Sequence, residues 1–258
     1  MSGRVLCVGE TCIELVARAD VFAPELGGSA ARVAAAAARM GAPVALVGGV
    51  GDDEWGRWLR VRLAAAGVNL SRFELRAGVQ TPLAVVSGAS TARYGQTLDG
   101  PGVQSVAGAG ALFISLTGPD ERETVQRARA LALEHDLPVI FAPALRLERW
   151  RSQADAAASA NACVPGALLV RVTAAEGMIL TGEDDPERAA QALVKAGARL
   201  VVLTLGSAGA ILRGELRGEV FEGVSSEDLF TGVLLARLAL SDFYPAVVAA
   251  ALGEACRA

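Results

Sequence analysis

The sequence predicts an α/β fold: a three-layer α/β/α sandwich in which helices cover both faces of a mostly parallel central sheet. Short apolar segments alternate with segments of helical periodicity along most of the chain, and this alternation is typical of parallel strands joined by crossover helices. A length of 258 residues suits one large domain, so we expect a single domain over residues 1–258.

One region interrupts the alternation. Two strand-like segments, residues 81–87 and 91–96, flank Gly88-Ala89-Ser90, and this arrangement predicts a β hairpin. A hairpin inside an α/β chain suggests a small β lid over one edge of the sheet. We therefore expect a short lid hairpin near residues 81–96, with residues 14–26 as a second candidate for lid strands.

The remaining elements follow from local patterns. Runs rich in Val, Leu, Ile and Phe predict strands at residues 4–9, 43–47, 111–115, 138–141, 167–170 and 200–205. Ala-rich or amphipathic stretches predict helices at residues 29–40, 54–66, 120–134, 174–180, 186–196, 228–240 and 245–256. Acidic residues before the second helix favour its N-terminus, and Gly67 ends it.

Composition argues against several classes of protein. The formal charge is −4 and the basic residues are scattered, so nucleic-acid binding has little support. No apolar run approaches the length of a membrane span, and the N-terminal residues lack the layout of a signal peptide. Four dispersed cysteines and a single histidine argue against a zinc site or a disulfide framework. We expect a cytoplasmic protein with neither nucleic acid nor membrane as a partner.

Two glycine-rich motifs carry the most specific signal. The first is Gly27-Gly28-Ser-Ala-Ala-Arg32, and the second is Gly51-Asp52-Asp53-Glu54-Trp55-Gly56 at a strand-to-helix turn. In order and spacing they resemble the first signature of the ribokinase-like (PfkB-type) carbohydrate kinases, in which a lid hairpin also follows. The resemblance implies the ribokinase-like fold and phosphorylation of a sugar by ATP.

A third motif lies where the helix over residues 228–240 should begin. Amide groups at a helix N-terminus attract anions, and the chain there reads Ser225-Ser226-Glu227-Asp228. This loop resembles the family's Gly-Ala-Gly-Asp loop, whose Asp removes the proton from the sugar hydroxyl. The resemblance makes Asp228 the catalytic base, although an Asp at this place also caps a helix, which is worth about 1 kcal/mol. Side chains in the glycine places obstruct a phosphate, and the charge of Glu227 would repel it.

Weaker resemblances assign the other candidate residues. The segment Ala142-Pro143-Ala144-Leu145-Arg146 resembles Asp-Pro-Asn-x-Arg of the 2-keto-3-deoxygluconate kinase and fructokinase branch, with alanines in both polar places. For the sugar site the resemblance implies Glu14, Gly27, Gly28, Arg32 and Arg146. For the nucleotide site it implies Thr204, Gly206, Gly209, Ser225 and Ser226. Glu176, with Thr173 in the usual Asn place, corresponds to a motif linked to magnesium.

Two hypotheses stay open at this point. In the first, the chain is a kinase that uses ATP and Mg²⁺ to phosphorylate a hydroxyl of a small sugar or sugar acid. In the second, it is a catalytically impaired protein of the same fold that binds a metabolite or a protein partner. The resemblance favours the first hypothesis, and the chemistry of residues 225–228 favours the second. The family also suggests a homodimer formed through the lid.

Overall fold

The computed structural model describes residues 4–87, 90–95 and 105–258. Within these residues the central sheet has nine strands in the order β13-β12-β11-β10-β9-β8-β1-β4-β5. The seven strands β11, β10, β9, β8, β1, β4 and β5 run parallel to one another. Strands β12 and β13 extend the sheet beyond β11, and each pairs antiparallel with its neighbour. The strands are β1 (Arg4–Val8), β4 (Val44–Gly51), β5 (Asn69–Arg76), β8 (Ala109–Ser115), β9 (Val139–Ala142), β10 (Leu169–Thr173), β11 (Leu200–Thr204), β12 (Ala210–Gly214) and β13 (Gly218–Val220).

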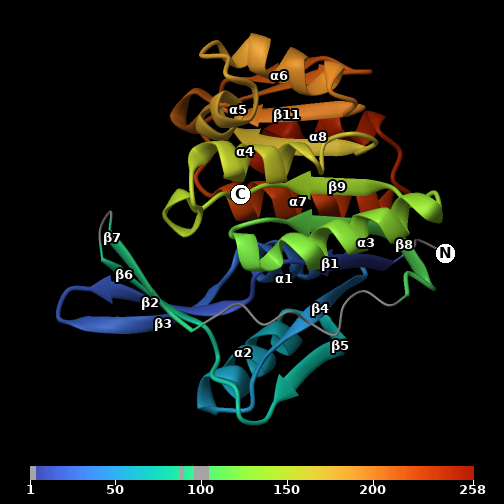
Figure 1. The fold of residues 1–258 in the computed structure, drawn as a ribbon. Helices are drawn as coiled ribbons and strands as arrows, with labels where there is room; N and C mark the ends of the chain where they lie inside the picture. Colours follow the sequence, from blue (N-terminus) through green and yellow to red (C-terminus); the bar gives the residue numbers. More distant parts are fainter. Residues whose placement is uncertain (1–3, 88–89, 96–104) are drawn as a thin grey trace.

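Helices cover both faces of this sheet (Figure 1). One face packs against α1 (Ser29–Arg39), α2 (Glu54–Ala65), α7 (Glu227–Leu240) and α8 (Ala246–Arg257). The other face packs against α3 (Arg122–Glu134), α4 (Gln153–Asn161), α5 (Ala174–Thr181) and α6 (Pro186–Lys195). The predicted three-layer α/β/α class is therefore confirmed. None of the helices in the described ranges is both long and apolar enough to cross a bilayer.

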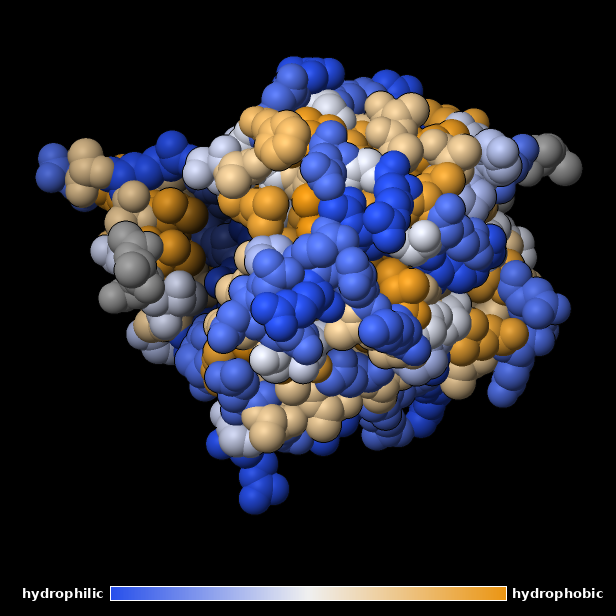
Figure 2. Space-filling model, turned by 90° about the horizontal axis from the view of Figure 1, so that it is seen from above, coloured by the Kyte–Doolittle hydropathy of each residue, from blue (hydrophilic) through white to orange (hydrophobic). Residues whose placement is uncertain are grey.

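A second sheet forms the lid, with strand order β3-β2-β6-β7. Its strands are β2 (Cys12–Arg18), β3 (Val21–Gly27), β6 (Leu83–Ser87) and β7 (Ser90–Tyr94). The lid projects from the side of the sandwich (Figure 1), and a hollow separates it from the body (Figure 2). The expected hairpin strands near 81–96 and the candidate strands in 14–26 are both part of it. The expected turn residues Gly88 and Ala89, and Gln96, lie outside the described residues.

The strand and helix bounds differ from the predicted ones at several places. The strand expected at 43–47 continues to Gly51, and the one expected at 167–170 lies at Leu169–Thr173. The helix expected at 120–134 begins as a short 3₁₀ turn, Pro119–Glu121. Strands β5, β12 and β13 and helix α4 were not predicted.

The close approach of α1 to α7 positions the two motifs that resemble a kinase. Helix α1 presents small, buried side chains, including Ala36 and Ala37, toward α7. A Cβ atom at Gly232 of α7 would lie 2.4 Å from the Cβ atom of Ala36, which is closer than van der Waals contact permits. At the start of α1, Gly28 has a φ of 83°, and a Cβ atom there would lie 2.2 Å from the carbonyl oxygen of Glu10. Glycine is needed at both positions.

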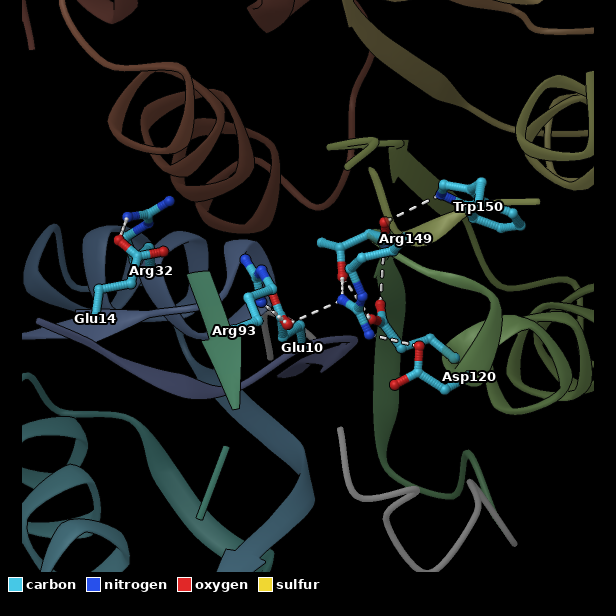
Figure 3. A network of polar contacts seen from close by, with 9 residues as sticks. Glu10, Glu14, Arg32, Arg93, Asp120, Arg149 and Trp150 are labelled. Atoms are coloured by element: carbon cyan, nitrogen blue, oxygen red, sulfur yellow. Dashed lines mark hydrogen bonds and ion pairs between the residues drawn. The ribbon is translucent and has the colours of Figure 1, made fainter. Parts of the chain in front are cut away.

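A buried ion-pair network joins the lid to the body (Figure 3). Glu10, which follows β1, accepts hydrogen bonds from Arg93 of lid strand β7 and from Nη1 of Arg149, the latter at 3.0 Å. The same Arg149 nitrogen lies 3.2 Å from Oε1 of Glu121. Thr117 donates its backbone N–H to the other Glu121 oxygen, at 3.1 Å. Burial and the nearby Glu10 carboxylate raise the pKa of Glu121 to about 8, although Thr117 and Arg149 oppose the change.

We predict that Gly232→Ala destabilises the protein by about 1–3 kcal/mol, because the added methyl group forces α7 away from α1. The matched control is Gly253→Ala in α8, where a Cβ atom would meet only the side chain of Arg257, at 3.4 Å. That control should be neutral or stabilising by up to about 1 kcal/mol, because alanine favours a helix. Urea unfolding of both variants measures the difference, and equal stabilities would contradict close packing at Gly232.

We predict that the free energy of unfolding falls as pH rises from about 4.5 to about 8, the ordinary and raised pKa values of Glu121. In that range the folded protein keeps a proton that the unfolded chain has released, so rising pH favours unfolding. Glu121→Gln should flatten this dependence because glutamine does not ionise. Glu123→Gln, at the exposed start of α3, should keep the wild-type dependence. Urea unfolding across this pH range tests the assignment, and an unchanged slope in Glu121→Gln would refute it.

Candidate functional site

A cavity of about 740 Å³ opens where the carboxyl ends of the parallel strands meet the start of α7. Ligands of open α/β sheets bind at this edge. Charged and hydroxyl side chains from separate parts of the chain line the cavity, and the structure therefore brings several motifs together. The lining residues used below are Glu10, Ser29, Arg32, Arg146, Arg171, Thr173, Glu176, Ser225, Ser226, Glu227 and Asp228.

Asp228 lies in the first turn of α7 and has two firm partners. Its Oδ1 accepts a hydrogen bond of 2.7 Å from the hydroxyl of Ser29, and its Oδ2 accepts one of 2.7 Å from Nε of Arg32. Ser226, the N-cap of α7, accepts a weaker hydrogen bond from Leu229 N–H at 3.4 Å. Asp228 is thus held at the positive end of a helix, with 13% of its side chain exposed to the cavity.

Arg32 bridges two of the predicted site residues. While Nε binds Asp228, Nη1 donates to Oε2 of Glu14 at 2.7 Å, and Figure 3 shows this pair apart from the Glu10 network. Burial disfavours the guanidinium charge, but Asp228 and Glu14 outweigh it and raise the pKa of Arg32. Arg32 therefore binds the carboxylates of both Asp228 and Glu14. Any ligand that approaches Oδ2 of Asp228 must share it with Arg32 or displace Arg32.

Glu227 turns toward the protein interior. Its Oε2 accepts hydrogen bonds from Thr204 Oγ1 at 2.8 Å and from Arg171 Nη1 at 3.3 Å. Burial raises the pKa of Glu227, and Arg171 and Thr204 act in the opposite direction. The expected repulsion of a phosphate by Glu227 is therefore offset by a cation directly beside it.

Arg171 is the main site residue that the sequence reasoning missed. It lies in the middle of β10 with 2% of its surface exposed, and its Nε donates to Thr231 Oγ1 at 2.9 Å. Besides Glu227, its Nη1 lies 3.7 Å from Oε2 of Glu176. A charged residue inside the apolar run Leu-Val-Arg-Val-Thr was the available signal, because an arginine is rarely buried without a specific partner.

Both carboxylate oxygens of Glu176 accept hydrogen bonds from the protein. It forms a capping box with Thr173 at the start of α5, and its Oε2 accepts the Thr173 N–H at 2.9 Å. Its Oε1 accepts the N–H of Leu145 at 3.0 Å. Within the described ranges, no three His, Cys, Asp or Glu side chains gather as a metal-binding group. A hard cation there would need oxygen ligands from water or a bound phosphate in addition to this carboxylate.

Of the other predicted residues, one lines the cavity and the glycines shape the backbone around it. Arg146 lines the cavity, and its backbone N–H donates to the Thr117 carbonyl at 3.1 Å. Gly27 lets Glu14 pack close by, since a Cβ atom there would lie 2.6 Å from Cγ of Glu14. Gly206 and Gly209 form a turn next to the loop that leads into α7, where Gly206 accepts the Val224 N–H at 2.9 Å.

Comparisons with known proteins agree with this geometry. The sequence model for pfkB family carbohydrate kinases matches residues 2–256. Fructokinase-1 of Oryza sativa subsp. japonica is 30% identical, with 92% of this chain and 84% of the relative covered. A fructokinase of Klebsiella pneumoniae is 25% identical, with 93% and 85% covered.

Solved structures give the same result. A PfkB protein from Polaromonas sp. JS666 has a TM-score of 0.83 and 25% identity, and covers 99% of this chain and 95% of its own. A fructokinase double mutant from Vibrio cholerae O395, in a form with fructose, ADP and potassium bound, has a TM-score of 0.88 and 26% identity, with 98% and 90% covered. The expected ribokinase-like fold and the likeness to the fructokinase branch are confirmed, and this chain belongs to the pfkB family of carbohydrate kinases.

Proposed function

We propose that this chain is an ATP-dependent kinase for a hydroxyl group of a small sugar or sugar acid, with Asp228 as its catalytic base. The observation that carries the proposal is the position of Asp228 at the N-terminus of α7, inside a cavity of about 740 Å³. Fructokinase relatives support sugar as the substrate class, and the neighbour with fructose and ADP bound supports a nucleotide.

Asp228 takes the proton of the sugar hydroxyl as that oxygen attacks the γ-phosphorus of ATP. The bond from the γ-phosphorus to the bridging oxygen breaks, ADP leaves, and the products are a sugar phosphate and protonated Asp228. Ser29 and Arg32 orient the carboxylate before the sugar binds. Glu14 and Arg146 are proposed to contact the sugar hydroxyls, and Gly27 and Gly28 leave room for them.

Arg171 is proposed to supply the positive charge that the altered loop does not supply. Phosphoryl transfer depends on positioning and on stabilising charge at the phosphate. The guanidinium of Arg171, the N-terminal amides of α7 and the hydroxyls of Ser225 and Ser226 lie along one part of the cavity. In the ligand-free protein Glu227 holds this anion position. An incoming phosphate would exchange with it.

Nucleotide and magnesium would bind beside this position. Thr204 and the turn with Gly206 and Gly209 are proposed to border the nucleotide. The oxygen donors present fit Mg²⁺, which prefers carboxylates, phosphates and water, and Glu176 would hold it in part through water. When bound, Mg²⁺ would supply positive charge that neutralises the phosphates.

A homodimer through the lid is also proposed. Val21 and Phe22 of the lid hairpin, and Tyr94 of β7, are more than half exposed. Exposed apolar side chains gathered on one small sheet are typical of an interaction surface.

We predict that Asp228→Asn lowers kcat by about 10²–10⁴-fold, because the amide cannot accept the hydroxyl proton. ADP formation with Mg·ATP and a panel of small sugars measures the loss. The matched control is Asp184→Asn, which changes an exposed aspartate near the start of α6 and should leave the rate unchanged. Equal rates in Asp228→Asn and the wild type would exclude Asp228 as the base.

We predict that Glu227→Gly raises kcat, because it opens the anion position and removes a repelling charge. A single well-placed donor in such a site is worth about 10²–10³-fold, which sets an upper limit for the gain. Without ligand the variant should unfold at a lower temperature, because Arg171 loses a partner, and Mg·ATP should restore more stability than in the wild type. Glu227→Gln removes the charge of this side chain but keeps its size, so it shows which of the two properties limits kcat. A lower kcat in both variants would show instead that Glu227 assists the reaction.

A further inference from the structure

A second cavity, of about 350 Å³, lies between α1, α2, lid strand β3 and the first turn of α7. Arg32 and Asp228 line both this cavity and the candidate active site, so the two cavities meet at that ion pair. None of the chemistry proposed above uses the second cavity.

Three arginines face this space from two helices. Arg32 and Arg39 are two turns apart on α1, and Arg62 follows Trp58 by one turn on α2, so each pair shares one helix face. The guanidinium carbon of Arg62 lies 4.9 Å from the centre of the Trp58 ring, and this cation–π contact holds the charge over the cavity. Helix geometry thus brings three cations together.

Arg32 is compensated by Asp228 and Glu14, whereas the charges of Arg39 and Arg62 are not paired within the described ranges. Glu25 and Asp228 line the cavity, but Glu25 is ion-paired with Arg18 and Asp228 with Arg32. In the described part of the chain, neither Arg39 nor Arg62 has a carboxylate within ion-pair distance. Among the described residues, Arg32 donates to its two partners through Nε and Nη1, which leaves its Nη2 for a ligand.

We propose that this cavity binds a small oxyanion, the phosphate or carboxylate group of a metabolite, through Arg39, Arg62 and Nη2 of Arg32. Guanidinium groups match such anions because their N–H groups bind two oxygens at once. The volume suits a small metabolite, and the Trp58 ring provides an apolar wall for its carbon skeleton. The bound anion would lie beside the Arg32–Asp228 pair, outside the position proposed for the sugar.

The test is isothermal titration calorimetry of the full chain with inorganic phosphate, glycerol 3-phosphate and D-gluconate. The two phosphates and the carboxylate distinguish the possible sources of the oxyanion, and D-fructose serves as the uncharged control. The Arg39→Gln/Arg62→Gln double variant should bind the preferred anion at least about tenfold more weakly, because charged hydrogen bonds are lost. Arg60→Gln, an exposed arginine on α2 outside the cavity, should bind it as the wild type does.

Repeating the titration with saturating Mg·AMP-PNP, an ATP analogue whose γ-phosphate is not transferred, separates this cavity from the phosphate position at Arg171, and binding should persist. Loss of binding with Mg·AMP-PNP would assign the anion to the active site and overturn the proposal. Unchanged affinity in the double variant, or failure of all three anions to bind the wild type, would also overturn it. The first titration contains no nucleotide, so no phosphate can be transferred and its result does not depend on whether the chain is an active kinase.

Discussion

The site depends on the close packing of α1 against α7. These helices are separated in sequence by most of the chain, and small side chains on α1 together with Gly232 bring their N-terminal ends together. That approach places Ser29 and Arg32 at hydrogen-bond distance from Asp228. The proposed catalytic base, the proposed sugar-site motif and the proposed anion position therefore all depend on the distance between the axes of α1 and α7.

The loop over residues 225–228 carries a charged side chain at Glu227, and an ion pair compensates that charge. A glutamate in the last glycine place introduces a carboxylate, and a buried arginine on the neighbouring strand β10 neutralises it. Removal of either partner alone would leave a buried charge, which is costly. Arg32 acts similarly between Glu14 and Asp228. Both arginines hold the carboxylates of the site in ion pairs.

The sequence predicted most of the sandwich because buried parallel strands are continuous apolar runs. It missed β5 because this edge strand, Asn69–Arg76, carries exposed charged residues. It missed α4 because the nine residues of this helix do not separate into an apolar face and a polar face. At the site, local motifs located Asp228, Glu176 and Arg32. The partners of Glu227 could not be predicted, since Arg171 and Thr204 reach it only through the alignment of β10, β11 and α7.

The most direct test of the proposed kinase is ADP formation by the wild-type protein with Mg·ATP, in the presence and absence of each member of a panel of small sugars and sugar acids. If the site is that of a kinase, ADP is released only when one of these compounds is present. A phosphate ester of that compound is then formed in an amount equal to the ADP. Binding of both ATP and sugar without any sugar-dependent ADP formation would contradict the proposed kinase. That result would instead support a ligand-binding protein built on a kinase fold.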